Sequence, residues 1–310
     1  MTAKSRPCLT MRVLVTALLS SLFPLMAFPQ SKSKSPPSKT QVVLLGTGTP
    51  GWDPDRSGPA TAIVVNGTPY LVDFGPGVVR RAGAAYQKGV KALYPPNIRV
   101  AFLTHRHIDH TVGYADLIFS PAQAADGILP PLEVYGPTGL KEMTEHILKA
   151  HMRNPNDERY KVNAHEIKPG IVYTDANVTV TAFPVKHGNV EAYGYRFETR
   201  DRTIVISGDT TPTQSVIDNC NGCDVLIHEA YSMMTHEQAT PENQAAQKRL
   251  HTSSYELADI ANKAKPKLLV LYHRSNIGGM GGPNPEEILV KEIKKIHKGK
   301  VVTGHDLDIF

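Results

Sequence analysis

Three imidazoles and one carboxylate fall within six residues of the chain, in the stretch Thr104-His105-Arg106-His107-Ile108-Asp109-His110. Imidazole and carboxylate groups are ligands for zinc and similar divalent ions. His105 and His107 are two residues apart and Asp109 adjoins His110, so a loop that turns here can direct one pair to one ion and the other pair to a second. The stretch predicts a metal site, against the alternative of a polar loop that is merely rich in histidine.

Further His, Asp and Glu residues lie at the ends of apolar, strand-like runs. The run 100–104 leads into the motif, and four later runs also end next to a metal-competent residue: 178–185 before His187, 203–207 before Asp209, 224–227 before His228 and Glu229, and 268–272 before His273. Chance would also place such residues on helices and hairpins. Ligands gathered at one edge of packed sheets are typical of sites built on rigid elements. We therefore expect these strand ends to meet.

The H-x-H-x-D-H pattern after an apolar strand resembles the signature of the metallo-β-lactamase superfamily of hydrolases. The resemblance runs from about residue 41 to the C-terminus and implies an α/β fold, a four-layer αββα sandwich. Several further stretches are similar to the ribonuclease Z branch of zinc phosphodiesterases: Leu45-Gly46-Thr47-Gly48-Thr49-Pro50, the Asp73 loop, Ser207-Gly208-Asp209-Thr210, His228-Glu229-Ala230 and His251-Thr252-Ser253. Residues 132–139 and 111–113 are also similar to arylsulfatases of the same fold.

The resemblance implies two bound ions, Zn²⁺ or other divalent transition metals. Matched motif by motif, His105, His107 and His187 would hold the first ion. Asp109, His110 and His273 would hold the second, and Asp209 would bridge the two. Two ions so placed polarise the substrate and generate the hydroxide that attacks the ester. Asp109 is thus a candidate catalytic residue as well as a ligand.

Four residues outside the ligand set have predicted roles in catalysis, in substrate binding or in support of the site. A departing alkoxide needs a proton, and the resemblance assigns His251 as the general acid with Glu229 as its orienting carboxylate. The alternative is that His251 only anchors the helix that follows. Arg274 adjoins His273 and could contact an anionic ester oxygen, against a surface ion pair as the alternative. The resemblance implies that Asp73 supports the metal site from behind. The alternative is that it caps the helix predicted at 78–88, and the two roles are compatible.

Short-range patterns predict the elements around these residues. Asn66-Gly67 favours a β-hairpin. A helix or tight turn is expected at 112–120, and a helix at 139–153 with Thr138 as its cap. Ser253 and Glu256 have capping-box spacing for a helix that runs to about residue 264. His146, His151 and His165 lack ligand spacing and are expected at the surface.

Residues 1–38 do not match the fold, and 39–310 are expected to form one domain. Lys4, Arg6 and Arg12 precede an apolar run at 13–28 and a Ser, Lys and Pro-rich segment, which is typical of a secretory signal peptide and linker. The run is short for a bilayer crossing, which needs roughly 20 residues, so we expect a secreted or periplasmic protein without a stable membrane span. The alternative is a membrane anchor that is not cleaved.

Charge and cysteine content fit this interpretation. Removing residues 1–30 takes away three basic and no acidic residues, which lowers the net charge from +5 to +2 and gives no electrostatic argument for nucleic acid. Cys220 and Cys223 then remain as a C-x-x-C pair. In an oxidising compartment this pair favours a local disulfide over the alternative of a redox or zinc role, because no second Cys pair completes a site.

The leading functional prediction is a phosphodiester hydrolase of the ribonuclease Z type. A sulfate-ester hydrolase, a lactonase or β-lactamase, and a binding module without catalysis are the alternatives. The candidate partners are an anionic ester, whether small molecule or nucleic acid, and a second copy of the chain in a homodimer. Ribonuclease Z enzymes of the long-arm type insert a tRNA-binding arm between the motif residues matched here by His187 and Asp209. Only residues 188–208 lie between them in this chain, so tRNA is not the expected substrate.

Overall fold

The structure is a computed structural model that describes residues 39–51, 53–152, 154, 156–274 and 286–310. The chain divides into two compact units, Met1–Pro36 and Pro37–Phe310. The first unit lies outside the described residues, and with it the predicted signal peptide. In the part that is described, no helix has the length and apolar character needed to cross a membrane.

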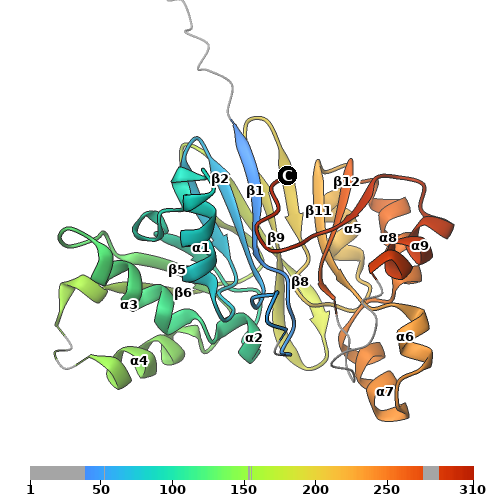
Figure 1. Ribbon diagram of the computed structural model, residues 1–310, viewed down its shortest axis with the longest axis horizontal. Helices are drawn as coiled ribbons and strands as arrows, with labels where there is room; N and C mark the ends of the chain where they lie inside the picture. Colours follow the sequence, from blue (N-terminus) through green and yellow to red (C-terminus); the bar gives the residue numbers. More distant parts are fainter. Residues whose placement is uncertain (1–38, 52, 153, 155, 275–285) are drawn as a thin grey trace, which may run out of the picture. The chain divides into compact units, whose positions relative to one another are not determined.

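Two mixed β-sheets form the centre of the second unit (Figure 1). The first sheet has the strand order β1-β2-β3-β4-β5-β6. Its strands are β1 Thr40–Gly46, β2 Ala60–Val65, β3 Thr68–Val72, β4 Val100–Phe102, β5 Leu132–Gly136 and β6 Val162–Glu166. The second sheet has the order β13-β12-β11-β10-β9-β8-β7. Its strands are β7 Gly170–Thr174, β8 Thr179–His187, β9 Val190–Glu198, β10 Thr203–Ile206, β11 Val225–Ala230, β12 Leu268–Arg274 and β13 Val301–Thr303.

Helices cover the outer face of each sheet. The first sheet carries α1 Val78–Gln87, α3 Tyr114–Ala124 and α4 Leu140–His151, and the second carries α5 Gln214–Cys220, α8 Ser254–Ala264 and α9 Glu286–Ile296. The remaining α-helices are the short turn α2 Ile108–Thr111 and the pair α6 Met233–Glu237 and α7 Pro241–Leu250. Single 3₁₀ turns lie at Lys91–Leu93, Pro95–Asn97 and Glu158–Tyr160. The layer order is thus helix, sheet, sheet, helix, as expected for the four-layer sandwich.

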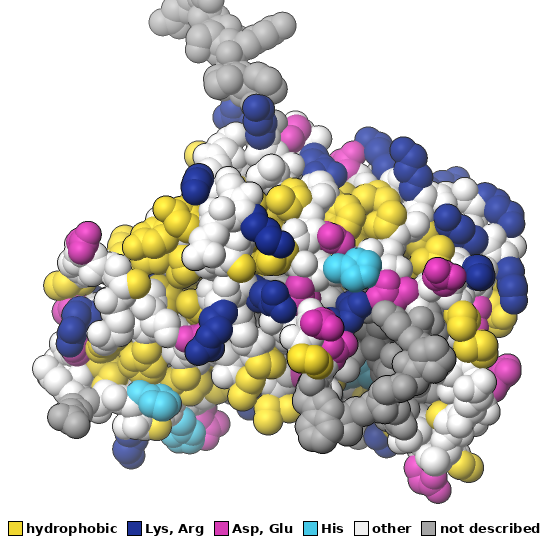
Figure 2. Space-filling view, in the orientation of Figure 1, with side chains coloured by type: hydrophobic (Ala, Val, Ile, Leu, Met, Phe, Trp, Pro, Cys, Tyr) yellow, Lys and Arg dark blue, Asp and Glu magenta, His cyan; other side chains and the backbone are white. Residues whose placement is uncertain are grey.

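The core lies in three apolar layers between these four. In β1, Val42 and Leu44 pack between the sheets, whereas Val43 and Leu45 pack under the outer helices. Since both faces of the strand are buried from Val42 to Leu45, this stretch is apolar without alternation, after the polar residues Thr40 and Gln41. Figure 2 shows the outer surface from the same side, where Lys and Arg side chains gather over α8 and α9.

Local predictions are mostly confirmed. β2 and β3 pair as an antiparallel hairpin around Asn66 and Gly67, whose φ values of 51° and 83° fit a tight turn. Ser253 and Glu256 form the predicted capping box of α8, which ends at Ala264. Cys220 and Cys223 form the predicted local disulfide between α5 and β11, and both residues are buried.

Two helix predictions need correction. Thr138 does not cap α4. The N-cap residue is Gly139, with φ 89°, which has no side chain that could accept a capping hydrogen bond. Instead Glu166 of β6 accepts hydrogen bonds from the backbone N–H of Gly139 at 2.7 Å and of Lys141 at 3.4 Å. The helix expected at 112–120 is also displaced, since α2 occupies 108–111 and α3 begins at Tyr114.

Candidate metal centre

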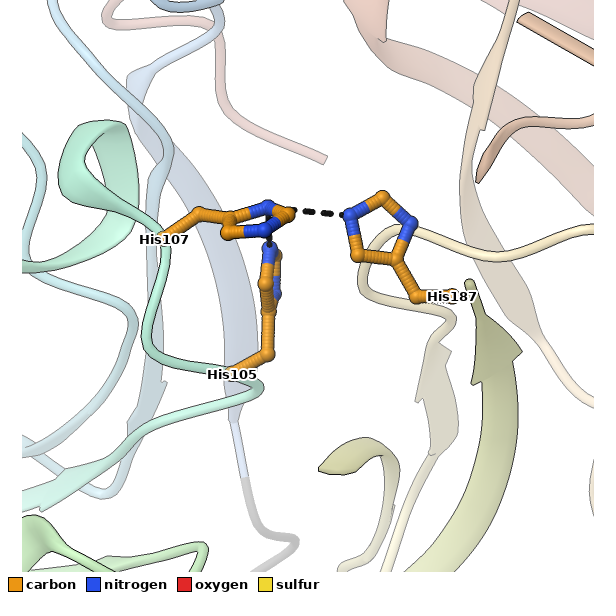
Figure 3. A group of neighbouring side chains, drawn as sticks. All are labelled: His105, His107 and His187. Carbon is orange, nitrogen blue, oxygen red and sulfur yellow. Dashed lines mark hydrogen bonds between the residues drawn. The ribbon is translucent and has the colours of Figure 1, made fainter. Parts of the chain in front are cut away.

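The first group of predicted ligands, here called the first subsite, consists of His105, His107 and His187. His105 lies in the loop after β4, His107 is the N-cap residue of α2, and His187 is the last residue of β8. The three rings converge (Figure 3). His107 Nδ1 lies 3.0 Å from His105 Nε2 and 3.0 Å from His187 Nε2. The strand ends therefore meet as the sequence predicts.

In His187 and His105, the ring nitrogen that faces away from the subsite contacts a neighbouring oxygen atom. His187 Nδ1 donates to the carbonyl oxygen of Leu250 at 2.7 Å, and His105 Nδ1 lies 3.0 Å from Thr104 Oγ1. Burial lowers the pKa of His105 and His107, and lowers the pKa of His187 to about 4. The three imidazoles are therefore neutral at neutral pH, which is the form that binds a metal ion.

The second group, here called the second subsite, consists of Asp109, His110 and His273. Asp109 and His110 lie on α2, and His273 lies near the end of β12. Asp109 Oδ2 is 3.0 Å from His273 Nε2 and 3.5 Å from His110 Nε2. His273 has φ 39°, a left-handed conformation that non-glycine residues seldom adopt and that is frequent at functional sites.

Asp209, which follows β10, lies between the two subsites. Its Oδ2 is 3.9 Å from both His105 Nε2 and His187 Nε2. Its Oδ1 is 3.3 Å from His273 Nδ1 and 3.5 Å from His110 Nε2. Burial would raise the pKa of Asp209, but the histidines around it hold that pKa well below its usual range. The carboxylate thus faces both subsites in its charged form.

Asp73 supports the site from behind and does not cap a helix. Its carboxylate accepts hydrogen bonds from the Thr104 N–H at 2.8 Å and from the Thr104 hydroxyl, and His110 Nδ1 lies 2.8 Å from its Oδ2. The N-cap residue of α1 is Gly77, with no side-chain cap. Burial would lower the pKa of His110, but Asp73 and the other carboxylates nearby raise it well above the ordinary value. The capping alternative is therefore wrong.

The donor set fits a metal centre on its own chemistry. Within the described residues, His110 Nε2, Asp209 Oδ1 and His273 Nδ1 are buried polar atoms without a hydrogen-bond partner. Such atoms are costly to bury unless something binds them. In the first subsite, His107 Nδ1 lies 3.0 Å from each of the other two nitrogens, close to the roughly 3.3 Å between two ligand nitrogens around a tetrahedral zinc ion with bonds near 2.0–2.1 Å. In each subsite the three candidate ligand atoms lie within 4.8 Å of one another.

His251 and Glu229 lie beside the two subsites. The His251 ring centre is 5.4 Å from that of His187 and 5.9 Å from that of His273. His251 Nδ1 is 3.3 Å from Glu229 Oε2. Burial would lower the pKa of His251, but the Glu229 carboxylate raises it to about 9. The predicted neighbours are thus brought together with the imidazole protonated at neutral pH.

Other predicted residues lie elsewhere. His146 and His151 are exposed on α4, and His165 of β6 is half-exposed and contacts Glu133 at 2.7 Å. None of the three joins the centre, as expected. Arg274 ends β12, but its side chain lies outside the described residues, so its substrate contact stays a prediction.

Sequence reasoning missed the residues that orient the site. The backbone N–H groups of Thr210 and Thr252 donate to Glu229 Oε1 at 3.2 and 3.0 Å, and the Thr252 hydroxyl donates to the Thr210 carbonyl at 2.6 Å. Leu250 acts through its carbonyl oxygen alone. Main-chain atoms leave no signal in residue type, although Thr252 adjoins the motif residue His251.

Comparison with known proteins gives one consistent family. The family model of the beta-lactamase superfamily domain matches residues 68–274. Ribonuclease Z of Mycobacterium bovis (strain BCG / Pasteur 1173P2) is 30% identical over 281 residues, which cover 86% of this chain and 96% of that protein.

Solved structures agree with this at the level of the fold. The metallo-beta-lactamase fold protein YhfI from Bacillus subtilis aligns with a TM-score of 0.68 at 20% identity, covering 88% of this chain and 99% of that one. Human tRNase Z, short form, aligns with a TM-score of 0.66 at 22% identity, covering 87% and 98%. The chain therefore belongs to the β-lactamase superfamily, in its ribonuclease Z-like branch of metal-dependent hydrolases.

Proposed function

We propose that the chain is a dizinc phosphodiesterase that cleaves RNA-type phosphodiester bonds. The two subsites would each hold one ion and Asp209 would contact both. Relatives named ribonuclease Z support the substrate class. When bound, two such ions supply Lewis acidity at the ester and a nucleophile at neutral pH.

The arrangement of Glu229 and His251 is the strongest structural support for this proposal. Glu229 is fully buried, and its Oε1 is held by two backbone N–H groups, which leaves Oε2 for His251. The carboxylate therefore lies 3.3 Å from the imidazole nitrogen and keeps the imidazole protonated. A proton held at this position, against both subsites, can be delivered to an alkoxide as it leaves a phosphodiester. A binding module without catalysis would have no use for this pair.

A comparison of leaving groups tests the acid role. His251→Ala should slow cleavage of a diester with a poor alkoxide leaving group by roughly 10²–10⁴-fold, and should slow an activated aryl diester far less. Metal content should remain at two ions per chain. Equal slowing of both substrates at unchanged metal content would leave His251 only its anchoring role at the start of α8.

A substrate panel tests the ester class. Aryl phosphodiester, aryl sulfate, lactone and pre-tRNA would be offered to metal-loaded protein that lacks residues 1–38. We expect turnover of the aryl phosphodiester to exceed turnover of the aryl sulfate and of the lactone. Faster turnover of the sulfate would instead favour the arylsulfatase alternative.

The proposal also includes export to an oxidising compartment. It is supported by the basic, apolar and polar succession of residues 1–38 and by the buried disulfide between Cys220 and Cys223. The mature chain should begin between about residues 27 and 39. Intact mass of the exported protein measures this, and a product that still carries residues 1–28 would favour an anchor.

A further inference from the structure

Nine exposed lysine and arginine residues lie at one edge of the two sheets, where β1, β12 and β13 begin, and at the adjoining ends of α8 and α9. We call this surface the basic edge, and it consists of Lys39, Arg200, Lys263, Lys265, Lys267, Lys294, Lys295, Lys298 and Lys300. Figure 2 shows Lys and Arg side chains along the upper part of the view, from the start of β1 to α8 and α9. The proposed function gives none of these residues a role.

Contacts between the starts of strands join these residues into one surface. The Thr40 hydroxyl, at the start of β1, donates to Asp201 in the turn between β9 and β10 at 2.6 Å. The Thr203 N–H, at the start of β10, donates to Asp224 at 2.7 Å, and Asp224 lies 2.7 Å from Lys267 Nζ, just before β12. β13 pairs with β12 in parallel and so begins at the same edge. The basic edge is therefore continuous from β1 to β13.

The metal centre lies at the other end of these strands. β12 begins at Leu268 on the basic edge and ends at Arg274, directly after the candidate ligand His273. Its length, about 20 Å at roughly 3.3 Å per residue, separates the two ends. Asp209 likewise follows the end of β10, which runs parallel to β11 and so to β12. A ligand at the basic edge therefore does not compete with a substrate for the metal centre.

The basic edge is a local excess of charge on a body that is neutral as a whole. Five of the 34 basic residues and none of the 29 acidic residues precede residue 39, so residues 39–310 carry 29 of each kind. A uniform surface of this composition would have no basic patch. The basic edge therefore produces a local positive potential that the near-zero net charge conceals.

Carboxylates leave most of this charge unpaired. Among the nine residues, Lys267 pairs with Asp224, and the other eight form no ion pair with a carboxylate of the described chain. The helix dipole accounts for basic residues in the last turns of α8 and α9. It does not account for Arg200 or Lys300, which lie outside both helices. The remaining charge is complementary to an anionic partner.

The path of the chain favours a membrane as that partner. Lys39 is the first described residue and directly precedes β1, so the chain passes from the basic edge into residues 1–38. In the sequence those residues include the apolar run 13–28 and two further lysines, Lys32 and Lys34. A chain that is exported by means of such a segment meets a bilayer, and basic residues near an anionic bilayer are attracted to its headgroups. Stable attachment to a membrane takes two signals, of which a basic patch is one.

RNA is also a polyanion, but it fits this place less well. RNA bound at the basic edge would lie at the end of the strands away from the metal centre, so the contact would not bring a phosphodiester to the metal ions. A membrane at the same place leaves the metal centre open to its substrate. Ile296, at the end of α9, is also exposed beside the lysines and offers a small apolar contact.

We propose that the basic edge binds the anionic headgroups of a phospholipid bilayer, with the metal centre on the side that faces away from the membrane. The contact is electrostatic, so it operates whether or not residues 13–28 remain on the mature chain. Salt screens the attraction between exposed charges, and the attachment therefore weakens at high ionic strength. The proposal does not rest on the phosphodiesterase function, because no substrate takes part in the contact.

Matched charge variants of the full chain test the proposal. The test variant replaces three residues of the basic edge by glutamine: Arg200, Lys265 and Lys300. The control variant makes the same change at three exposed residues on α1 and α4: Arg80, Lys141 and Lys149. The probes are vesicles of phosphatidylcholine alone and vesicles of phosphatidylcholine mixed with anionic phosphatidylglycerol. Binding to the neutral vesicles measures the contribution of apolar contacts, which the substitutions leave in place.

The wild type should bind the anionic vesicles more tightly than the neutral ones, and the test variant should lose about 10²-fold of the affinity for anionic vesicles at about 0.1 M salt. The control variant should match the wild type, and both variants should keep the wild-type Tm. Equal affinity of the two variants for anionic vesicles would overturn the proposal, as would equal affinity of the wild type for both kinds of vesicle. A test variant that loses affinity for an RNA hairpin but binds vesicles like the wild type would overturn it in favour of nucleic acid. Vesicle binding needs no turnover, so none of these results depends on the proposed function.

Discussion

The two subsites of the metal centre differ in charge although they share Asp209. The first subsite has three neutral imidazoles, held from behind by a hydroxyl and a backbone carbonyl. The second subsite contains the carboxylate of Asp109, and Asp73 raises the pKa of its His110. The difference indicates that the first subsite is ready to bind an ion, whereas the second must lose a proton first. The ion of the second subsite should therefore respond more strongly to pH and to mutations nearby.

Loss of the shared carboxylate should have the largest effect. Asp209→Ala removes the group that faces both subsites, so both ions should bind more weakly and kcat should fall by about 10³-fold, equivalent to about 4 kcal/mol. Kinetics at saturating zinc measures this. Asp201→Ala is the matched control, because Asp201 accepts hydrogen bonds from Thr40 at the start of β1 and is not one of the candidate ligands. A variant that lost only one ion would show that Asp209 does not bridge.

Asp73 should distinguish the subsites. Asp73→Asn leaves His110 Nδ1 without its carboxylate, and loss of such a supporting group weakens metal binding by about 10–100-fold. The effect should fall on the second ion, with much less change in the first. Competition against a zinc chelator measures both affinities. An equal loss of zinc affinity at both subsites would show that Asp73 does not act on the second subsite alone.

The pH dependence should also separate the two ions. The proton on His110 must leave when the second ion binds, so that affinity should fall about tenfold per pH unit below the raised pKa of His110. Burial keeps the pKa of His187 at about 4, so the first ion should bind with little proton release at neutral pH. Calorimetry in buffers of different ionisation enthalpy counts the protons. Equal proton release at both steps would argue against this assignment.

A distant carboxylate should give the smallest effect. Asp306 accepts hydrogen bonds from the N–H groups of Thr47 and Ser57 at 2.9 and 2.8 Å, and so fixes both ends of the loop after β1. A Cβ placed at the next residue, Gly58, would lie 2.8 Å from the carbonyl oxygen of Asp109. The loop therefore packs directly against the turn that carries the second subsite. Asp306→Ala should weaken the second ion by less than about tenfold, measured by the same chelator competition.

The matched control for Asp306→Ala is again Asp201→Ala. Asp201 accepts the Thr40 N–H at 3.1 Å, at the opposite end of β1. Both variants lose a carboxylate that binds a strand end, so both should lose some stability. Only the variant next to the metal turn should change metal affinity. A change of equal size in both would mean that general destabilisation is the cause.

Residue types and short spacings predicted much of this centre from the sequence. The seven candidate ligands follow the ends of four apolar runs, four of them in one motif, and the Ser253 and Glu256 box marks the start of α8, so each could be recognised locally. Asp73 could be placed at a strand end but not given one role, because its partner His110 lies 37 residues away and the turn geometry decides which donors reach it.

Contacts between distant segments could not be predicted where neither segment carries a motif. The cap of α4 comes from Glu166, which lies 27 residues after Gly139 and meets it only because β6 pairs with β5. Asp306 meets Thr47 across 259 residues. Such features depend on tertiary pairing and leave little trace in local sequence.

The number of ions bound per active chain tests the central claim most directly. Protein stripped with a chelator and titrated with Zn²⁺ would be assayed with an aryl phosphodiester while its metal content is measured. We predict that each chain binds two ions, and that activity rises until the second equivalent of Zn²⁺ has bound. Full activity with one tightly held ion per chain would contradict it.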